Sequence, residues 1–279
     1  MEVNVIDTGF FKLDGGAMFG VVPKSLWSRI QPADENNLCT WAMRCLLVQT
    51  TGRNILIDTG IGDKQSEKFR SHFQPHGSDT LLNSLQQSGL SAEDITDVFL
   101  THLHFDHVGG AVKRNAEGDL VPTFPNATYW SNEKHYNWAI RPNPREKASF
   151  LKENIIPLKE AGVLQFLPVQ KEDLEWLPGF KVRFVYGHTE AMMVPIIDFR
   201  GKRLFYCADV IPSSFHVSLP YIMSYDLRPL MTLEEKTRIL EEAVTNQGYL
   251  FFEHDPKTAA ATIKKNDRNR FVLGETVAW

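Results

Sequence analysis

The stretch Thr101-His102-Leu103-His104-Phe105-Asp106-His107 carries the pattern His-x-His-x-Asp-His and comes directly after an apolar run that predicts a strand. A loop leaving a strand can point alternate residues into one cavity. We therefore expect His102 and His104 to share one metal ion, and Asp106 and His107 to face a second. Imidazole nitrogens and carboxylate oxygens suit zinc and comparable divalent ions. A pattern of this density has only a small risk of arising by chance.

Three more residues of the same ligand types stand at the ends of predicted strands further along the chain. They are His188 after residues 181–187, Asp209 after residues 204–208, and His254 after residues 249–253. Taken singly, each residue of this kind is more often a surface or core residue than a ligand. Taken together with the first motif, they complete a set of seven that suffices for two metal ions. The expected sets are His102, His104 and His188 for one ion, Asp106, His107 and His254 for the other, and Asp209 as the bridge. A bridging carboxylate is needed because two cations repel unless an anion separates them.

The composition is that of an ordinary globular protein. Of the 279 residues, 43% are hydrophobic and 23% are charged, and the formal net charge is −4, which excludes disorder as the main state. The slightly acidic balance, without a block of Lys or Arg, argues against nucleic acid or an anionic membrane as a partner. No signal-peptide pattern and no apolar run of about 20 residues is visible. Because Cys39, Cys45 and Cys207 match no zinc or redox spacing, we expect a cytoplasmic protein with reduced thiols and a small-molecule substrate.

Apolar periodicity predicts strands alternating with helices. Strands are expected at residues 43–49, 54–57, 97–101, 181–186, 194–199, 203–207 and 249–252, and helices at residues 79–87, 132–140, 145–159 and 232–244. Residues 51–53 suggest a hairpin turn, and Thr232 with Glu235 predicts a capping box at the start of the last helix. No repeat or linker divides the chain, so we expect a single domain over residues 1–279 with an α/β layered architecture.

The order of these motifs resembles the metallo-β-lactamase superfamily, whose dinuclear hydrolases use His-x-His-x-Asp-His, a later His, a later Asp and a final His. The resemblance runs from Asp58 to Asp255 and implies a four-layer αβ/βα sandwich, with two sheets face to face, helices outside and the metals at one edge. It also implies the ligand assignments given above. Asp58, in Asp58-Thr59-Gly60, matches the family's strand-end aspartate, which supports a ligand histidine from behind. Asp255 is a further candidate for that role.

Within the superfamily the chain is similar to the lactonase and methyl-parathion-hydrolase-like group. His104 stands where the flavodiiron branch has an acidic residue, and the extra domain and basic surface of the nucleic-acid-processing branch are absent from the sequence. Residues 14–20 and 23–27 resemble a loop of the lactonase-like group. Two departures weaken any transfer of acyl-homoserine lactone specificity. Pro212 stands where the best-known lactonases have a Tyr, and Thr189-Glu190-Ala191-Met192 replaces Thr-Pro-Gly-His.

An apolar, aromatic stretch follows Asp209, and it forms either one wall of the substrate pocket or ordinary packing. The pocket candidates are Phe19, Trp27, Phe215, His216, Leu219, Tyr221, Ile222 and Met223. A wall of this kind favours an acyl chain or an aryl leaving group over a highly charged substrate.

We expect a metal-dependent hydrolase that cleaves a lactone or an ester by attack of a hydroxide held between two metal ions. The ions lower the pKa of water and polarise the substrate carbonyl, and Asp106 or a metal-bound water protonates the leaving oxygen. Asp106 and Asp209 are therefore the expected catalytic residues. The ions are zinc, or manganese, iron or cobalt according to supply. A phosphotriesterase or a thioesterase on the same fold stays open as an alternative. From a different class, an iron-dependent oxidoreductase and a non-catalytic metal-binding protein stay open too, as does a homodimer.

Overall fold

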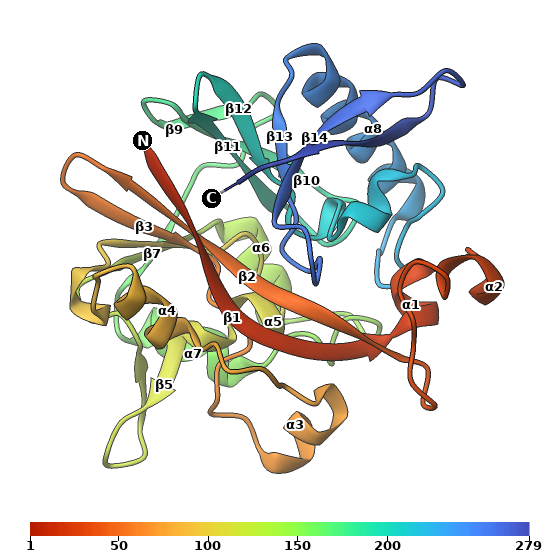
Figure 1. The fold of residues 1–279 in the computed structure, drawn as a ribbon. Coiled ribbons are helices and arrows are strands. Elements are labelled where there is room, and N and C mark those ends of the chain that lie inside the picture. Colours follow the sequence, from red (N-terminus) through yellow and green to blue (C-terminus); the bar gives the residue numbers. More distant parts are fainter. Residues whose placement is uncertain (279) are drawn as a thin grey trace. The chain divides into compact units, whose positions relative to one another are not determined.

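A computed structural model, drawn as a ribbon in Figure 1, describes residues 1–278 of the chain. The chain divides into two compact units. The first unit comprises residues 1–9, 43–71 and 77–171, and the second comprises residues 10–42, 72–76 and 172–279. Strand β1 (Glu2–Asp14), strand β2 (Leu38–Thr50) and helix α3 (Glu67–Phe73) contribute residues to both units. Strands and helices occur together in each unit, which confirms the α/β class.

The first unit contains a six-stranded sheet in the order β1-β2-β3-β4-β7-β8. Its other strands are β3 (Arg53–Ile57), β4 (Asp97–Phe99), β7 (Thr128–Ser131) and β8 (Leu164–Phe166), and its helices are α4 (Leu81–Gln87), α5 (Phe105–Val108), α6 (Glu133–Ile140) and α7 (Lys152–Glu160). The 3-10 turns η1 (Ala92–Asp94) and η2 (Gly109–Ala111) and a small sheet of β5 (Val112–Arg114) and β6 (Leu120–Pro122) complete it. Strands β2 and β3 form the predicted antiparallel hairpin, whereas β3, β4, β7 and β8 pair in parallel.

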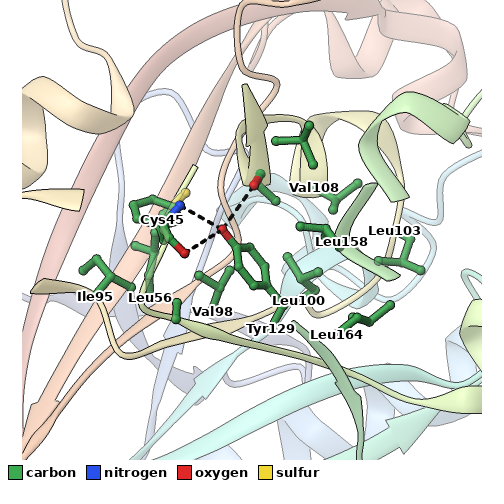
Figure 2. Packing of buried hydrophobic residues seen from close by; sticks show 14 of the residues in the cluster. Cys45, Leu56, Ile95, Val98, Leu100, Leu103, Val108, Tyr129, Leu158 and Leu164 are labelled. Atoms are coloured by element: carbon green, nitrogen blue, oxygen red, sulfur yellow. Dashed lines mark hydrogen bonds between the residues drawn. The ribbon is translucent and has the colours of Figure 1, made fainter. Parts of the chain in front are cut away.

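The apolar core of the first unit holds the loop that carries the His-rich motif. Leu103 lies inside the motif and Val108 directly follows it, and both are fully buried in the same cluster as Leu158 of α7 (Figure 2). Burying a leucine side chain stabilises a fold by roughly 1.5–3 kcal/mol. The motif loop is therefore fixed to its unit by apolar side chains that alternate with the ligand candidates.

Tyr129 of β7 fastens the chain just after the motif. Its hydroxyl accepts a hydrogen bond from the backbone N–H of Phe124 at 2.9 Å and donates to the carbonyl of Ala111 at 3.2 Å (Figure 2). Burial raises the pKa of the Tyr129 hydroxyl, so this group stays protonated and can keep donating. The end of η2 is thus tied to β7, the neighbour of the edge strand β8.

The second unit contains a seven-stranded sheet in the order β15-β14-β13-β12-β11-β10-β9. Its strands are β9 (Leu174–Leu177), β10 (Phe180–Val185), β11 (Met192–Phe199), β12 (Lys202–Tyr206), β13 (Tyr249–Phe251), β14 (Ala260–Lys265) and β15 (Phe271–Thr276). Its helices are α1 (Gly15–Phe19), α2 (Lys24–Trp27) and α8 (Pro229–Thr245), with 3-10 turns η3 (Ala208–Val210) and η4 (Ser214–Val217). Within the described residues of this sheet, β12 and β13 pair in parallel, and every other neighbouring pair is antiparallel.

Two helix predictions are wrong at their starts. Helix α8 begins at Pro229, three residues before the predicted start, because proline is well suited to the first helical turn. Thr232 and Glu235 therefore lie inside the helix and form no capping box there. The helix predicted at residues 145–159 begins at Lys152, because the Asn143 side chain accepts hydrogen bonds from the N–H groups of the next residues and closes a turn instead.

Over residues 1–278, no helix combines the length and the apolar character that a bilayer crossing requires.

Candidate metal centre

The first unit presents the His-rich motif on the loop after β4 and on α5. His102 and His104 lie on the loop, whereas Asp106 and His107 lie on the short helix. All four side chains are buried, with exposed fractions between 0 and 7%. Nε2 of His102 lies 3.1 Å from Nδ1 of His104. The first two ligand candidates thus face each other through one nitrogen of each ring.

The neighbours of these two rings determine which nitrogens carry protons. Thr101 Oγ1 donates to Oδ2 of Asp58 at 2.6 Å, so it accepts from Nδ1 of His102, 3.1 Å away. Nε2 of His104 lies 3.5 Å from Oε1 of Glu146, and a proton on this nitrogen would face that carboxylate. Nε2 of His102 and Nδ1 of His104 are then two lone-pair nitrogens in close approach, which repel unless a cation lies between them. This donor set fits a divalent metal ion.

Asp58 supports the motif from the residue after β3. Its Oδ1 accepts from the backbone N–H of Thr101 at 2.8 Å, and its Oδ2 accepts from Nδ1 of His107 at 3.1 Å. Nε2 of His107, which lies 3.9 Å from Oδ2 of Asp106, is then the ring nitrogen left with a lone pair. Metal-bound histidines usually donate their second N–H to a carboxylate or a carbonyl, and the contact of Asp58 with His107 has that form.

The second unit brings His188, Asp209 and His254 together from the loops after β10, β12 and β13. Nε2 of His188 lies 3.1 Å from Oδ2 of Asp209, and Nε2 of His254 lies 3.1 Å from Oδ1 of the same carboxylate. Because β12 and β13 are parallel, their carboxyl ends meet at the same sheet edge, and Asp209 and His254 leave the sheet together. The carboxylate of Asp209 thus lies between two imidazole rings.

A hydrogen bond at Nδ1 orients each of the two imidazole rings of this second set. Nδ1 of His188 donates to Oδ1 of Asp226 at 2.8 Å, and Nδ1 of His254 donates to the carbonyl of Ala42 at 2.8 Å. Each Nε2 therefore presents its lone pair to a carboxylate oxygen, which is favourable only if a proton or a metal ion lies between them. The donor set of the second unit also fits divalent metal ions.

The electrostatics of His188 agree with this geometry. Burial opposes a charge on the ring, but the carboxylates of Asp209 and Asp226 outweigh burial and raise the pKa of His188 to about 10. Burial in turn raises the pKa of the Asp226 carboxyl group. Positive charge is therefore favoured between the ring and the carboxylates, and metal ions compete with protons for such positions.

Left-handed backbone conformations cluster next to the ligand candidates. Asp58 has φ +58°, Ala191 has φ +52° and Ala208 has φ +43°. Such conformations cost of order 1 kcal/mol or more outside glycine and are typical of functional sites. Ala191 also belongs to the segment that departs from the family pattern, Thr189-Glu190-Ala191-Met192, and it adopts a conformation that suits glycine.

Three acidic residues that orient these loops were not predicted. Asp226 orients His188, and Glu146 faces His104 while its Oε2 accepts from Nε1 of Trp138 at 2.6 Å. Glu235 accepts from the N–H groups of residues 186 and 187, at 2.7 and 2.9 Å, just before His188. Each of them is far in sequence from the group it holds, so no local pattern marks it.

Asp255 holds the turn after His254. Its carboxylate accepts hydrogen bonds from the backbone N–H groups of Ser214, Lys257 and Thr258, at 2.9, 2.8 and 2.7 Å. The ring of His254, by contrast, donates to the carbonyl of Ala42. Asp255 therefore connects this turn to η4.

Five of the predicted pocket residues gather in one aromatic cluster of the second unit. The ring of Phe19 stacks on Trp27 at 5.3 Å between centroids and on His216 at 5.2 Å, and it meets Tyr221 and Phe215 at 5.9 and 6.4 Å. The buried candidates are Phe19, Trp27, His216 and Met223, whereas Phe215, Leu219, Tyr221 and Ile222 are half-buried. The half-buried side chains keep the surface that contact with a ligand requires.

The family model described as the metallo-beta-lactamase superfamily matches residues 44–269, a range that includes all seven ligand candidates. The chain belongs to the metallo-β-lactamase superfamily. A probable metal-dependent hydrolase from Staphylococcus aureus has a TM-score of 0.87 to this member of the superfamily, with 29% identity over 99% of this chain and 98% of that one. The predicted metallo-β-lactamase fold is confirmed.

Two lactonases are more distantly similar to this superfamily member. N-acyl homoserine lactonase AiiA from Bacillus thuringiensis subsp. kurstaki is 23% identical over 244 residues, which cover 83% of this chain and 87% of that protein. AidC, a dizinc quorum-quenching lactonase solved with a product, has a TM-score of 0.79 and 22% identity over 99% of this chain and 95% of its own. The superfamily and these neighbours confirm the prediction of a metal-dependent hydrolase.

Proposed function

We propose that this member of the superfamily is a dinuclear metal-dependent hydrolase that opens a lactone or cleaves a related ester. One observation carries the proposal, namely that the second ring nitrogen of each candidate histidine faces an acceptor. The acceptors are Thr101 for His102, Glu146 for His104, Asp58 for His107, Asp226 for His188 and the Ala42 carbonyl for His254. Rings oriented in this way expose one lone pair each, which is the state that a metal ion requires.

The proposed site uses both units as one catalytic domain over residues 1–279. One ion is assigned to His102, His104 and His188, the other to Asp106, His107 and His254, and Asp209 is assigned to both. When bound, two divalent cations, zinc or manganese, iron or cobalt, acidify water and polarise a carbonyl group. The chain itself orients the imidazole rings through Asp58 and Asp226. The proposed role of Asp106 is to take a proton from the attacking water and pass it to the leaving oxygen.

The proposed substrate class is a lactone or an ester with an apolar acyl part. It is supported by the relatives, because AiiA is an N-acyl homoserine lactonase and AidC a quorum-quenching lactonase. The half-buried rings of Phe215 and Tyr221 suit an apolar chain. Pro212 offers no hydroxyl group to the substrate, and its carbonyl accepts from the backbone N–H of His254 at 2.9 Å. We therefore do not limit the proposed substrates to the acyl-homoserine lactones.

We further propose a cytoplasmic protein that acts on a small molecule, without a nucleic-acid or membrane partner. Its three cysteines are buried thiols, which suits a reducing compartment. Whether the protein forms a homodimer is tested by measuring the molar mass of the purified chain by light scattering.

The test is a hydrolysis panel on protein of measured metal content, with lactones of several acyl lengths, aryl esters, phosphotriesters, thioesters and β-lactams. We expect two ions per chain and a kcat/KM for acylated lactones at least about 100-fold above that for phosphotriesters and thioesters. Turnover confined to thioesters or phosphotriesters would replace the substrate class. Two bound ions without hydrolysis of any compound indicate a metal-binding protein, and redox-active iron with oxygen consumption indicates an oxidoreductase.

A further inference from the structure

Lys236 is a fully buried lysine in the middle of α8, with an exposed fraction of 0%. Its Nζ donates to the backbone carbonyls of Ser218 and Tyr221 at 2.8 Å each, and to that of Leu219 at 3.5 Å. Lysine is rarely buried unless its charge is compensated. A fully buried ammonium group that binds three carbonyl oxygens of one loop has the geometry of a specific anchor.

The three hydrogen bonds depend on the ammonium form of Lys236. An ammonium group has three N–H donors, whereas a neutral amine has two and points a lone pair at the third carbonyl. Burial lowers the pKa of Lys236 to about 7, and the nearby charge of Asp226 acts in the opposite direction. The carbonyl oxygens of the loop therefore do more than fill space around the side chain, because they compensate its buried charge.

The loop that Lys236 holds, residues 210–226, connects two groups of the candidate centre. It begins directly after Asp209 and ends at Asp226, which accepts the hydrogen bond from His188 at 2.8 Å. It carries Phe215 and Tyr221, the two aromatic rings of the cluster that keep exposed surface.

Other hydrogen bonds hold the loop on either side of the segment that Lys236 contacts. His216 contacts the Met18 carbonyl at 2.8 Å, and the N–H of Ser224 donates to the Ala17 carbonyl at 2.8 Å. Residues 218–221, between these two contacts, contain the carbonyls that accept from Lys236. Loss of the ammonium group would thus free the segment that precedes and includes Tyr221.

We propose that Lys236 is a positioning residue for substrate binding: it holds residues 218–221 so that the loop presents Phe215 and Tyr221 to the acyl part of the substrate. This inference rests on the proposed function, because it takes an acylated lactone or ester as the substrate. Lys236 itself contacts neither the ligand candidates nor the substrate. Its role is to keep the loop in one shape, so its removal acts on substrate affinity more than on the chemical step.

The test compares the full chain with Lys236→Met, which removes the ammonium group at similar volume, and with Lys236→Arg, which keeps the charge. Arg238→Met is the matched control, because it removes one positive charge from an exposed position of the same helix. Amide hydrogen exchange is measured for peptides within residues 210–226 and for peptides of the first unit. The KM and kcat for a long-chain acyl lactone and the bound metal are measured on the same preparations.

For Lys236→Met we expect exchange within residues 214–224 to rise at least about tenfold, while peptides of the first unit are unchanged. The KM is expected to rise about tenfold, with kcat within about threefold and metal content unchanged. Lys236→Arg is expected to recover at least half of the change in KM on a logarithmic scale. Arg238→Met is expected to match the wild type in every measurement.

Wild-type exchange within residues 214–224 in a folded Lys236→Met variant would overturn the anchor. A fall in kcat with unchanged KM would overturn the role in substrate binding. If Lys236→Met does not fold, Lys236→Gln is measured with the same expectations. The exchange measurement needs no substrate, so it judges the anchor even if the hydrolysis panel refutes the lactone or ester substrate.

Discussion

The two loops that carry ligand candidates are held by different kinds of contact. In the first unit, the motif loop inserts Leu103 and Val108 into an apolar cluster, and the ring of Phe105 meets Phe69 edge-on at 5.1 Å between centroids. In the second unit, buried polar groups, among them Lys236, hold residues 210–226 in addition to buried apolar side chains such as Val217 and Met223.

This difference predicts different sensitivities. Apolar contacts do not change with protonation, whereas a buried polar contact is strong only while both partners are present in the right protonation state. The motif loop should therefore respond to lost volume, and the loop of residues 210–226 should respond to lost charge or to acid. The ligand candidates themselves, in either unit, should respond most strongly of all.

The largest effect is expected for Asp209→Asn, which keeps the shape of the side chain and removes its charge. Both imidazole neighbours of Asp209 then face a neutral amide, and the carboxylate assigned to both ions is lost. We expect kcat/KM to fall about 1,000-fold or more and the bound metal to fall below two ions per chain. Kinetics and elemental analysis measure this, with Asp198→Asn on the exposed side of β11 as control. Full activity with two ions would exclude Asp209 as the bridge.

The next effect is expected for Leu103→Ala in the apolar anchor of the first unit. Leu103 has an exposed fraction of 0%, and removal of such a side chain costs about 2–5 kcal/mol. Urea unfolding measures the loss in the free energy of unfolding. Leu82→Ala is the control, because Leu82 is exposed by 43%, and its cost should stay within about 0.5 kcal/mol. An equal loss in the two variants would contradict the apolar anchor.

The contrast between the loops also explains what could be predicted from the sequence. The ligand candidates of the first unit are contiguous, so one local pattern identified His102, His104, Asp106 and His107 together. The β2–β3 hairpin followed from the turn at residues 51–53, and α4 followed from the spacing of its apolar residues. Such features depend on residues that are close together in the sequence, so a sequence pattern can predict them.

What could not be predicted depends on contacts between distant residues. In the sequence, Asp226, Glu235 and Lys236 look like surface charges of a loop and an amphipathic helix. The fold buries Asp226 and Lys236 and half-buries Glu235. Glu235 even fitted a capping box, because the sequence does not show that α8 begins earlier, at Pro229. The carboxylate of Glu235 instead accepts from the backbone just before His188. Tertiary contacts decided these roles, and the family resemblance did not indicate them.

The two orienting carboxylates allow a paired comparison of the units. Asp58→Asn and Asp226→Asn each weaken the support of one ligand histidine, and changes of this kind typically cost 10–100-fold in metal affinity, so we expect about that loss in each. Competition with a chelator measures the affinity. Asp226 also ends the polar-anchored loop, so only Asp226→Asn should raise amide exchange in residues 214–224. Equal amide exchange in residues 214–224 of both variants would contradict the difference between the two loops.

The last prediction concerns acid and His216, a polar contact of the same loop. Nε2 of His216 donates to the Met18 carbonyl at 2.8 Å, and Nδ1 accepts from Ser213 Oγ at 2.7 Å. Burial lowers the pKa of His216 to about 3, against about 6.5 in an unfolded chain. The folded protein thus keeps the ring neutral. Its stabilising contribution is fully present above pH 6.5 and is lost as the pH falls toward 3.

Between these two values the free energy of unfolding should lose up to about 1.4 kcal/mol per pH unit through His216 alone. His216→Gln removes the titrating group and keeps an amide that can donate to the Met18 carbonyl. Urea unfolding of both proteins at pH 7, 6, 5 and 4 gives the slope of the free energy of unfolding against pH. The carboxylates common to both proteins contribute equally to the two slopes, so the difference between the slopes reports His216. Leu103→Ala should show the wild-type slope, since an apolar anchor binds no proton. A shallower slope for His216→Gln would show that the neutral ring of His216 contributes to the acid sensitivity of the protein. A slope equal to that of the wild type would contradict this and assign the acid sensitivity to other groups.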